Sequence, residues 1–174
     1  MNGAGAARGT ESRQNLSLWT RRHRYVYGVG TMPPAPTAPL VLVVDDNRDT
    51  REIYALHLRT VGYRVETAEN GRDVTAKART RRPDAIVMDL SMPDVDGWAA
   101  IGELQADPRT AGIPVVVLTG HDLRDYLKRA AIAVGARSFL TKPCPPERLE
   151  REIAAQISTR PDAAARARRA APAE

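Results

Sequence analysis

Five short strand-like segments recur at a regular pitch along the middle of the chain. They are LVLVV (40–44), YRVETA (63–68), DAIVMD (84–89), PVVVLT (114–119) and ARSFLTK (136–142). Short, uniformly apolar runs are typical of strands buried on both faces, whereas the alternation in 63–68 is typical of an edge strand. This recurrence restricts the possible folds more than any other feature of the sequence.

Segments with helical periodicity separate the apolar runs. They cover residues 47–62, 70–83, 98–107, 121–135 and 145–158. In the first of them the apolar residues near helical spacing are Ile53, Leu56, Leu58 and Val61, and Gly62 is a stop signal. Five strands alternating with five helices predict an α/β fold, with a five-stranded parallel sheet, doubly wound, in three α/β/α layers.

Polar side chains follow four of the five apolar runs. The acid pair Asp45 and Asp46 follows the first run, and Asp89, Thr119 and Lys142 end the third, fourth and fifth. The carboxyl ends of parallel strands meet at one edge of the sheet, which is where ligands bind in such folds. Adjacent carboxylates repel each other and need compensation, so we expect these side chains to share one polar site.

The chemistry of this predicted site follows from its three carboxylates, one hydroxyl and one ammonium group. An oxygen-rich set without His or Cys favours a hard divalent cation, and Mg²⁺ is the expected metal. A carboxylate is able to act as a nucleophile and form an aspartyl phosphate, and Asp89 is the best candidate because it ends the central strand alone. Lys142 and Thr119 would then hold phosphoryl oxygens, with Asp45 and Asp46 as metal ligands or supports.

The segments VVDDN, IVMDLSMPDVDG, VVVLTG and FLTKP together resemble the receiver (response-regulator, chemotaxis-Y-like) domain of bacterial two-component signalling. Each segment alone is weak evidence, but all four occur in order, each at the end of a buried run. The resemblance extends from about Leu40 to Ser158. It implies a flavodoxin-like sheet with strand order 2-1-3-4-5.

The resemblance also implies a role for each residue of the site. Asp89 resembles the phosphoacceptor, which takes a phosphoryl group from a sensor histidine kinase or a histidine phosphotransfer protein. Asp46 resembles the direct Mg²⁺ ligand, and Asp45 resembles a ligand that acts largely through water. The backbone carbonyl of Ser91 is the implied third protein ligand, beside Asp89 itself.

Two further positions resemble the family's conformational switch. Thr119 resembles the hydroxyl that moves onto the phosphate, and Phe139 stands where the coupled aromatic residue stands. The bond from Lys142 to Pro143 resembles the family's cis proline, and X–Pro bonds are the ones that adopt cis at low cost. The chain departs from the pattern at Gly120, where alanine is usual, and at Phe139, which lacks the hydroxyl of the commoner tyrosine.

Charge and composition set the two ends of the chain apart. Of the net charge of +5, residues 1–38 carry +4 and residues 159–174 carry +2, which leaves −1 for residues 39–158. We therefore expect a disordered basic, Pro-rich segment over 1–38, the receiver domain over 39–158, and a disordered Ala/Arg-rich tail over 159–174. No apolar stretch approaches the ~20 residues of a transmembrane helix, and a single cysteine suits a reducing, cytoplasmic compartment.

The N-terminal segment allows two more specific readings. Twin-arginine export would use Arg21 and Arg22, but the apolar segment that should follow is short and runs into prolines. Translation from Met32 would place the start of the protein a few residues before the first strand.

The sequence raises three possible functions. The leading one is a stand-alone phosphoacceptor, not a turnover enzyme, that signals by protein–protein contact through its fourth helix, fifth strand and fifth helix (about 122–157). An aspartyl-phosphate phosphatase of the haloacid dehalogenase type would need a D-x-D arrangement, whereas Leu90 and Ser91 follow Asp89. A phosphorylation-independent binding module, with basic tails touching nucleic acid, would lack a recognition helix or an aromatic platform.

Overall fold

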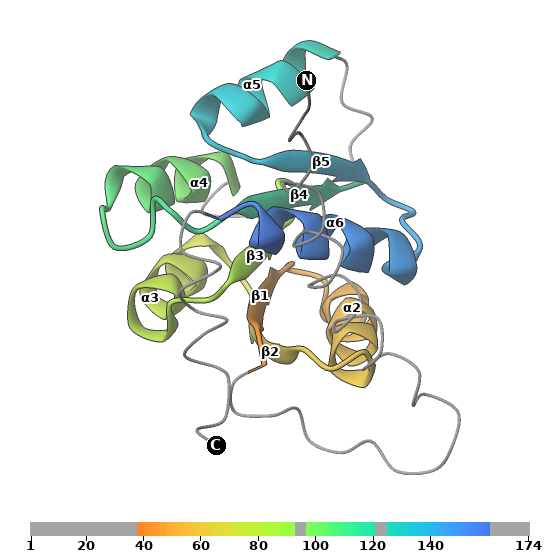
Figure 1. The fold of residues 1–174 in the computed structure, drawn as a ribbon. Coiled ribbons are helices and arrows are strands. Elements are labelled where there is room, and N and C mark those ends of the chain that lie inside the picture. The colour runs from red at the N-terminus through yellow and green to blue at the C-terminus, as the bar shows by residue number, and fades with distance from the viewer. Residues whose placement is uncertain (1–37, 93–96, 121–124, 161–174) are drawn as a thin grey trace, which may run out of the picture. The chain divides into compact units, whose positions relative to one another are not determined.

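A computed structural model describes residues 38–92, 97–120 and 125–160 of the chain. Within them five parallel strands form one sheet in the order β2-β1-β3-β4-β5 (Figure 1). The strands are β1 (Leu40–Val44), β2 (Arg64–Ala68), β3 (Ala85–Met88), β4 (Val115–Thr119) and β5 (Ser138–Thr141). The helices are α2 (Arg48–Thr60), α3 (Gly71–Arg81), α4 (Gly97–Ala106), α5 (Asp125–Val134) and α6 (Pro146–Ser158). The predicted flavodoxin-like topology is confirmed.

Helices cover both faces of the sheet, so the described domain has three layers. One hydrophobic cluster packs the sheet against α3, α4 and α5, and a second packs it against α2 and α6. Side chains alternate between the two clusters along each strand: Leu42 and Val44 belong to the first, Val41 and Val43 to the second. The predicted α/β/α layering is therefore confirmed (Figure 1).

The strands differ in burial as their sequence patterns predict. All residues of β1, β3 and β4 are buried, because helices cover both of their faces. In β2, which lies at an edge, only Ala68 is buried. The buried central strands bring their carboxyl ends, and the polar residues that follow them, to one edge of the sheet.

The buried face of α2 does not coincide with its apolar residues. Ile53 and Leu56 are 59% and 62% exposed, although they fall near helical spacing. The buried positions are Arg51, Tyr54, Ala55 and Leu58, which share one face at spacings of three and four. The Tyr54 hydroxyl and one terminal nitrogen of Arg51 donate to backbone carbonyls inside the domain, which offsets part of the cost of burying these side chains.

Asparagine side chains start the two helices that follow β1 and β2. The Asn47 side chain accepts a hydrogen bond of 2.9 Å from the Thr50 N–H at the start of α2. The Asn70 side chain does the same for the Asp73 N–H at the start of α3. These N-caps end each loop sharply, so Asp45 and Asp46 occupy the short step between a strand and a capped helix.

Some predictions fall outside the described residues and stay predictions. They are the disorder expected for residues 1–37 and 161–174, the acidic part of the loop at 93–96, and the first turn expected for the helix at 121–135. Among the helices that the structure does describe, none is long and apolar enough to cross a bilayer.

Candidate functional site

The side chains singled out in the sequence lie together at the carboxyl edge of the sheet. Asp45 follows β1, Asp89 follows β3, Thr119 ends β4 and Lys142 follows β5. Carboxylate oxygens of Asp45, Asp46 and Asp89 all lie within 4.8 Å of one another. Asp45 and Asp89 are buried, whereas Asp46 is exposed, so the acidic cluster extends from the interior to the surface.

Lys142 lies between the two buried acids. Its Nζ donates to Oδ2 of Asp45 and to Oδ2 of Asp89, at 2.6 Å in each case. Buried carboxylates are expensive unless they are paired and hydrogen-bonded, and the half-buried ammonium group supplies that pairing. The lysine explains how an apolar strand is able to run directly into an acid pair.

The surroundings perturb the charges in this cluster. Burial raises the pKa of the Asp45 carboxyl above its ordinary value and the charge of Asp89 adds to this, although Lys142 and the Asn47 N–H act in the opposite direction. Burial also lowers the pKa of Lys142, but its hydrogen bonds and ion pairs with Asp45 and Asp89 outweigh burial, and its pKa is raised. Lys142 therefore keeps its proton, and among the described residues it is the cation that hydrogen-bonds the carboxylates of the cluster.

The three carboxylates of the cluster exceed this ammonium group in charge, and the excess fits a second cation. Mg²⁺ binds oxygen ligands at about 2.0–2.1 Å, so ligand oxygens on opposite sides of the ion lie about 4 Å apart. The span of 4.8 Å across the three carboxylates is close to that distance. A set of carboxylates without sulfur or imidazole is also the donor chemistry that a hard cation prefers. The residues present therefore fit Mg²⁺.

Ser91 connects the acceptor candidate with the end of β4. Its backbone N–H donates to Oδ1 of Asp89 at 3.0 Å. Its Oγ shares a hydrogen bond of 3.0 Å with Oγ1 of Thr119, which is fully buried. Sequence reasoning implied a metal-ligand role for the backbone carbonyl of Ser91 and did not foresee the contact of its side chain with Thr119. Met88 of β3 pairs in register with Val117 of β4. This pairing places the residues that follow β3 beside those that end β4.

Phe139 and Pro143 stand on and just after β5. Phe139 is half-buried and packs against the cluster beneath α3, α4 and α5, while its neighbour Leu140 faces α2 and α6. The Lys142–Pro143 peptide bond is cis, as expected. Gly120 is exposed, and outside its immediate chain neighbours no described residue lies within 4 Å of the position where a Cβ would stand.

Sequence reasoning missed two residues that contact the loops of the site, Arg51 and Tyr54. The guanidinium of Arg51 donates from Nη1 to the backbone carbonyl of Asp45 at 2.6 Å and from Nη2 to Oε1 of Glu69 at 3.0 Å. The Tyr54 hydroxyl donates to the carbonyl of Cys144 at 3.0 Å. The signal that was available is their spacing from Ala55 and Leu58 on one face of α2.

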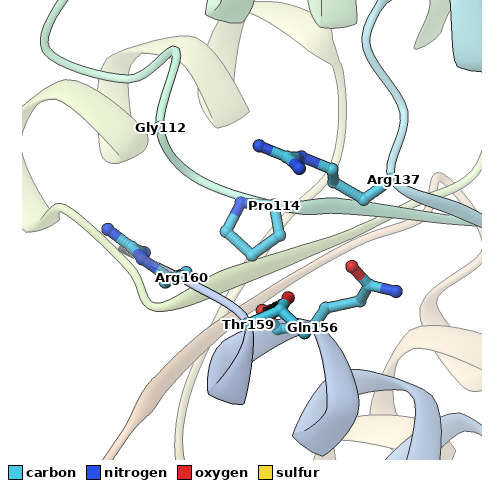
Figure 2. Close-up of a pocket in the computed structure, with 6 residues that line it drawn as sticks. All are labelled: Gly112, Pro114, Arg137, Gln156, Thr159 and Arg160. Atoms are coloured by element: carbon cyan, nitrogen blue, oxygen red, sulfur yellow. Dashed lines mark hydrogen bonds between the residues drawn. The ribbon is translucent and has the colours of Figure 1, made fainter. Parts of the chain in front are cut away.

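A separate pocket of about 100 Å³ lies at the opposite, amino edge of the sheet (Figure 2). Pro114 and Arg137, which line it, directly precede β4 and β5. Arg160 also lines it, and its guanidinium donates to the backbone carbonyls of Pro83 and Asp84. This pocket is distinct from the acidic cluster, and Arg160 serves there to attach the end of α6 to the sheet.

The sheet order and the acidic cluster at its carboxyl edge define the architecture of a receiver domain. Residues 41–154 match the family model described as the response regulator receiver domain. The chain therefore belongs to this family of two-component signalling domains. Receiver domains are usually not counted as turnover enzymes.

Individual proteins similar to this chain support its assignment to the receiver family. Protein PilH of Pseudomonas aeruginosa is 38% identical over 120 residues, which cover 68% of this chain and 97% of PilH. The chemotaxis protein CheY4 of Vibrio cholerae is similar in structure, with a TM-score of 0.65 and 33% identity over 68% of this chain and 98% of CheY4.

A third similar structure bears on the metal. The receiver domain of sensor histidine kinase PA1611 from Pseudomonas aeruginosa has a TM-score of 0.64 and 29% identity, and covers 70% of this chain and 99% of that domain. Its structure has a magnesium ion coordinated in the active site cleft. The cluster of Asp45, Asp46 and Asp89 is thus like a receiver Mg²⁺ site.

Proposed function

We propose that the chain is a phosphoacceptor response regulator in which Asp89 takes a phosphoryl group from a sensor histidine kinase or a histidine phosphotransfer protein. The observation that carries the proposal is the pairing of Asp89 with Lys142 at 2.6 Å, beside two further carboxylates within 4.8 Å. A buried nucleophile, a fixed ammonium group and a candidate cation site are the groups that phosphoryl transfer to a carboxylate requires.

In the proposed transfer, a carboxylate oxygen of Asp89 attacks the phosphorus atom of the donor. The P–N bond of the phosphohistidine breaks, its electron pair returns to the imidazole nitrogen, and that nitrogen takes up a proton. Mg²⁺, held by Asp45, Asp46, Asp89 and the Ser91 carbonyl, would supply positive charge to the phosphoryl oxygens. Lys142 would hold another phosphoryl oxygen by a charge-assisted hydrogen bond.

The output of the proposed switch begins at Thr119. Its hydroxyl, now bonded to Ser91, would move to a phosphoryl oxygen and leave room for the half-buried Phe139 ring to shift. Such a change biases an equilibrium between two conformations. The surface of α5, β5 and α6 would carry the signal to a protein partner, and the exposure of Ile132 (49%) and Val134 (37%) on α5 supports a contact there.

The rest of the proposal concerns the organisation of the chain. The receiver domain would extend over residues 39–158, with the basic segment 1–38 and the tail 159–174 outside it. The protein would act in the cytoplasm, as a signalling domain rather than a turnover enzyme. Ser91 stands at the position where a D-x-D phosphatase would need its second acid, so phosphatase activity toward other substrates is not proposed.

The test is the intact mass of the purified chain after treatment with acetyl phosphate and Mg²⁺. We expect a gain of one phosphoryl group that requires Mg²⁺ and is absent from Asp89→Ala. Asp73→Ala is a matched control, because it removes a surface carboxylate that pairs with Lys77 outside the site. No gain in the wild-type chain, under conditions that label a control receiver domain, would point to a phosphorylation-independent binding module.

A further inference from the structure

Two side chains of α2 reach backbone carbonyls in the two loops that carry the opposite charges of the site. Arg51 donates to the carbonyl of Asp45, and Tyr54 donates to the carbonyl of Cys144, two residues beyond Lys142. Arg51 and Tyr54 are three residues apart, so they lie on the same face of the helix. One helix face therefore contacts the acid pair on one side and the lysine loop on the other.

The contact of Arg51 acts on Asp46 through the peptide bond. The carbonyl of Asp45 belongs to the planar unit that joins Asp45 to Asp46, so a hydrogen bond that holds this carbonyl also restricts the direction of the Asp46 side chain. The N–H at the other end of Asp45 donates to the carbonyl of Ala68 at 3.3 Å. Both backbone groups of Asp45 are therefore held by hydrogen bonds. Asp46, the exposed acid of the cluster, follows directly, so its orientation is restricted.

The burial of Arg51 leaves one of its donors without a hydrogen bond among the described residues. Arg51 is 5% exposed, and this donor is its Nε. An unsatisfied buried donor destabilises the folded state. The hydrogen bonds that the guanidinium does make go to the Asp45 carbonyl and to Glu69. Its buried position therefore favours these two contacts at the expense of Nε.

The contact of Tyr54 acts on the position of the Lys142 ammonium group. The backbone N–H of Lys142 donates to the carbonyl of Thr119 at 2.8 Å, which attaches the lysine to the end of β4. The Tyr54 hydroxyl holds the same loop from α2 at Cys144. The segment that carries Lys142 is thus held from two elements, and its Nζ lies at 2.6 Å from both buried acids.

We propose that Arg51 and Tyr54 are positioning residues of the site: Arg51 orients Asp46 toward the cation, and Tyr54 places Lys142 against Asp89. The proposal rests on the proposed function where it concerns phosphoryl transfer, but its metal-binding part does not. A merely structural role would leave cation affinity and transfer rate unchanged once the variants are folded. The two contacts are tested separately.

The test of Arg51 is a calorimetric titration with Mg²⁺ alone, without any phosphoryl donor. Arg51→Met keeps the apolar stem and removes a positive charge from beside the acids, so electrostatics alone would strengthen Mg²⁺ binding. Positioning predicts the opposite, a dissociation constant raised about tenfold, as is common for residues that orient metal ligands. Unchanged or tighter binding in the folded variant would overturn this part of the proposal.

A conservative variant covers the case in which Arg51→Met does not fold. Arg51→Lys keeps the charge but lacks the planar fork that contacts both Asp45 and Glu69. We expect it to bind Mg²⁺ more weakly than the wild-type chain. Wild-type affinity in Arg51→Lys would contradict the need for this fork.

The test of Tyr54 is the rate of phosphoryl uptake over a series of acetyl phosphate concentrations at saturating Mg²⁺. Tyr54→Phe removes a single hydroxyl, and we expect the plateau rate to fall about tenfold while Mg²⁺ affinity stays unchanged. Tyr63→Phe is the matched control. Tyr63 is buried in the same hydrophobic cluster as Tyr54, but it directly precedes β2 and so lies at the amino edge of the sheet, away from the site. An equal fall in both variants would overturn the role of Tyr54.

The two arms separate failure of this inference from failure of the proposed function. If the wild-type chain takes up no phosphoryl group, the proposed function fails, and the Mg²⁺ titration of Arg51→Met still decides whether Arg51 positions the acids. If the wild-type chain is phosphorylated and neither variant differs from it, the proposed function stands and the positioning roles are wrong.

Discussion

The two edges of the sheet use charged side chains in different ways. At the amino edge, charged side chains hydrogen-bond backbone groups: Oδ2 of Asp84 accepts from the Leu40 N–H at 2.8 Å, and Arg160 donates to the carbonyls of Pro83 and Asp84. At the carboxyl edge, charges face one another: Lys142 pairs with Asp45 and Asp89. One edge completes the hydrogen bonds of the strands, whereas the other gathers charge in excess.

This difference distinguishes stabilising charges from charges placed for binding. Asp84 and Arg160 stabilise the folded chain without any ligand, because they hydrogen-bond backbone groups at the ends of strands. The acids of the carboxyl edge outnumber the single ammonium group, and an uncompensated buried charge destabilises a protein. The carboxyl edge therefore gives up stability that a bound cation is able to restore.

Removal of Lys142 should give the largest effect on this comparison. Lys142→Met leaves Asp45 and Asp89 buried without a cation, and we expect the free energy of unfolding to fall by about 3 kcal/mol. The measurement is urea unfolding without Mg²⁺, and added Mg²⁺ should recover part of the loss. The control, Lys77→Met, removes a surface pair with Asp73 and a hydrogen bond to the carbonyl of Thr67, and should cost about 1 kcal/mol. Equal losses in the two variants would contradict the comparison.

The same substitution at two glycines of α4 should have opposite effects. A Cβ at Gly97 would lie 2.4 Å from the carbonyl oxygen of Asp89, which is backbone and unable to rotate away. We expect Gly97→Ala to destabilise the domain by about 2 kcal/mol. Outside its own helical turn, no described residue lies within 4 Å of a Cβ at Gly102, so Gly102→Ala should stabilise by about 0.5–1 kcal/mol. Thermal unfolding of both variants checks the sign, and a loss at Gly102 would contradict this explanation.

At the amino edge, Asp84→Ala should separate stability from cation binding. Asp84 exchanges two hydrogen bonds with Leu40, one through its own N–H at 2.7 Å and one through its carboxylate at 2.8 Å. Losing the carboxylate leaves the Leu40 N–H without this acceptor, and we expect a loss of about 1–2 kcal/mol. The rise in Tm on addition of Mg²⁺ should match that of the wild-type chain. A smaller Mg²⁺ response would show that the two edges are coupled.

The smallest expected effect concerns Tyr63 and appears only at high pH. Burial, with a further contribution from the charge of Glu150, raises the pKa of Tyr63 well above its ordinary value of 10.0. Above pH 10 the unfolded chain releases this proton while the folded chain keeps it, so stability falls as the pH rises. Tyr63→Phe should make the decline in Tm between pH 9 and pH 11 shallower, as measured by circular dichroism. An unchanged slope would show that other groups cause the decline.

Local periodicity was sufficient to predict most of the fold. The burial of LVLVV and AIVM, the edge position of 64–68 and the five helices follow from patterns that span only a few residues. The apolar spacing of α2 did not reveal its buried face, because Ile53 and Leu56 are exposed while Arg51 and Tyr54 are buried. Hydropathy favours them over Arg51 and Tyr54, and it does not register that a buried polar group finds an acceptor elsewhere in the chain.

The sequence by itself determined which chemical groups stand at the strand ends, because each follows its own apolar run. Only the tertiary structure decided how they meet: Lys142 contacts Asp45 across 97 positions of the chain, and Ser91 contacts Thr119 across 28. It also decided that Arg51 and Tyr54 hold the loops of the site. Hydrogen bonds to backbone carbonyls depend on the position of the acceptor in space rather than on its residue type. The pattern of side chains along the sequence therefore does not predict them.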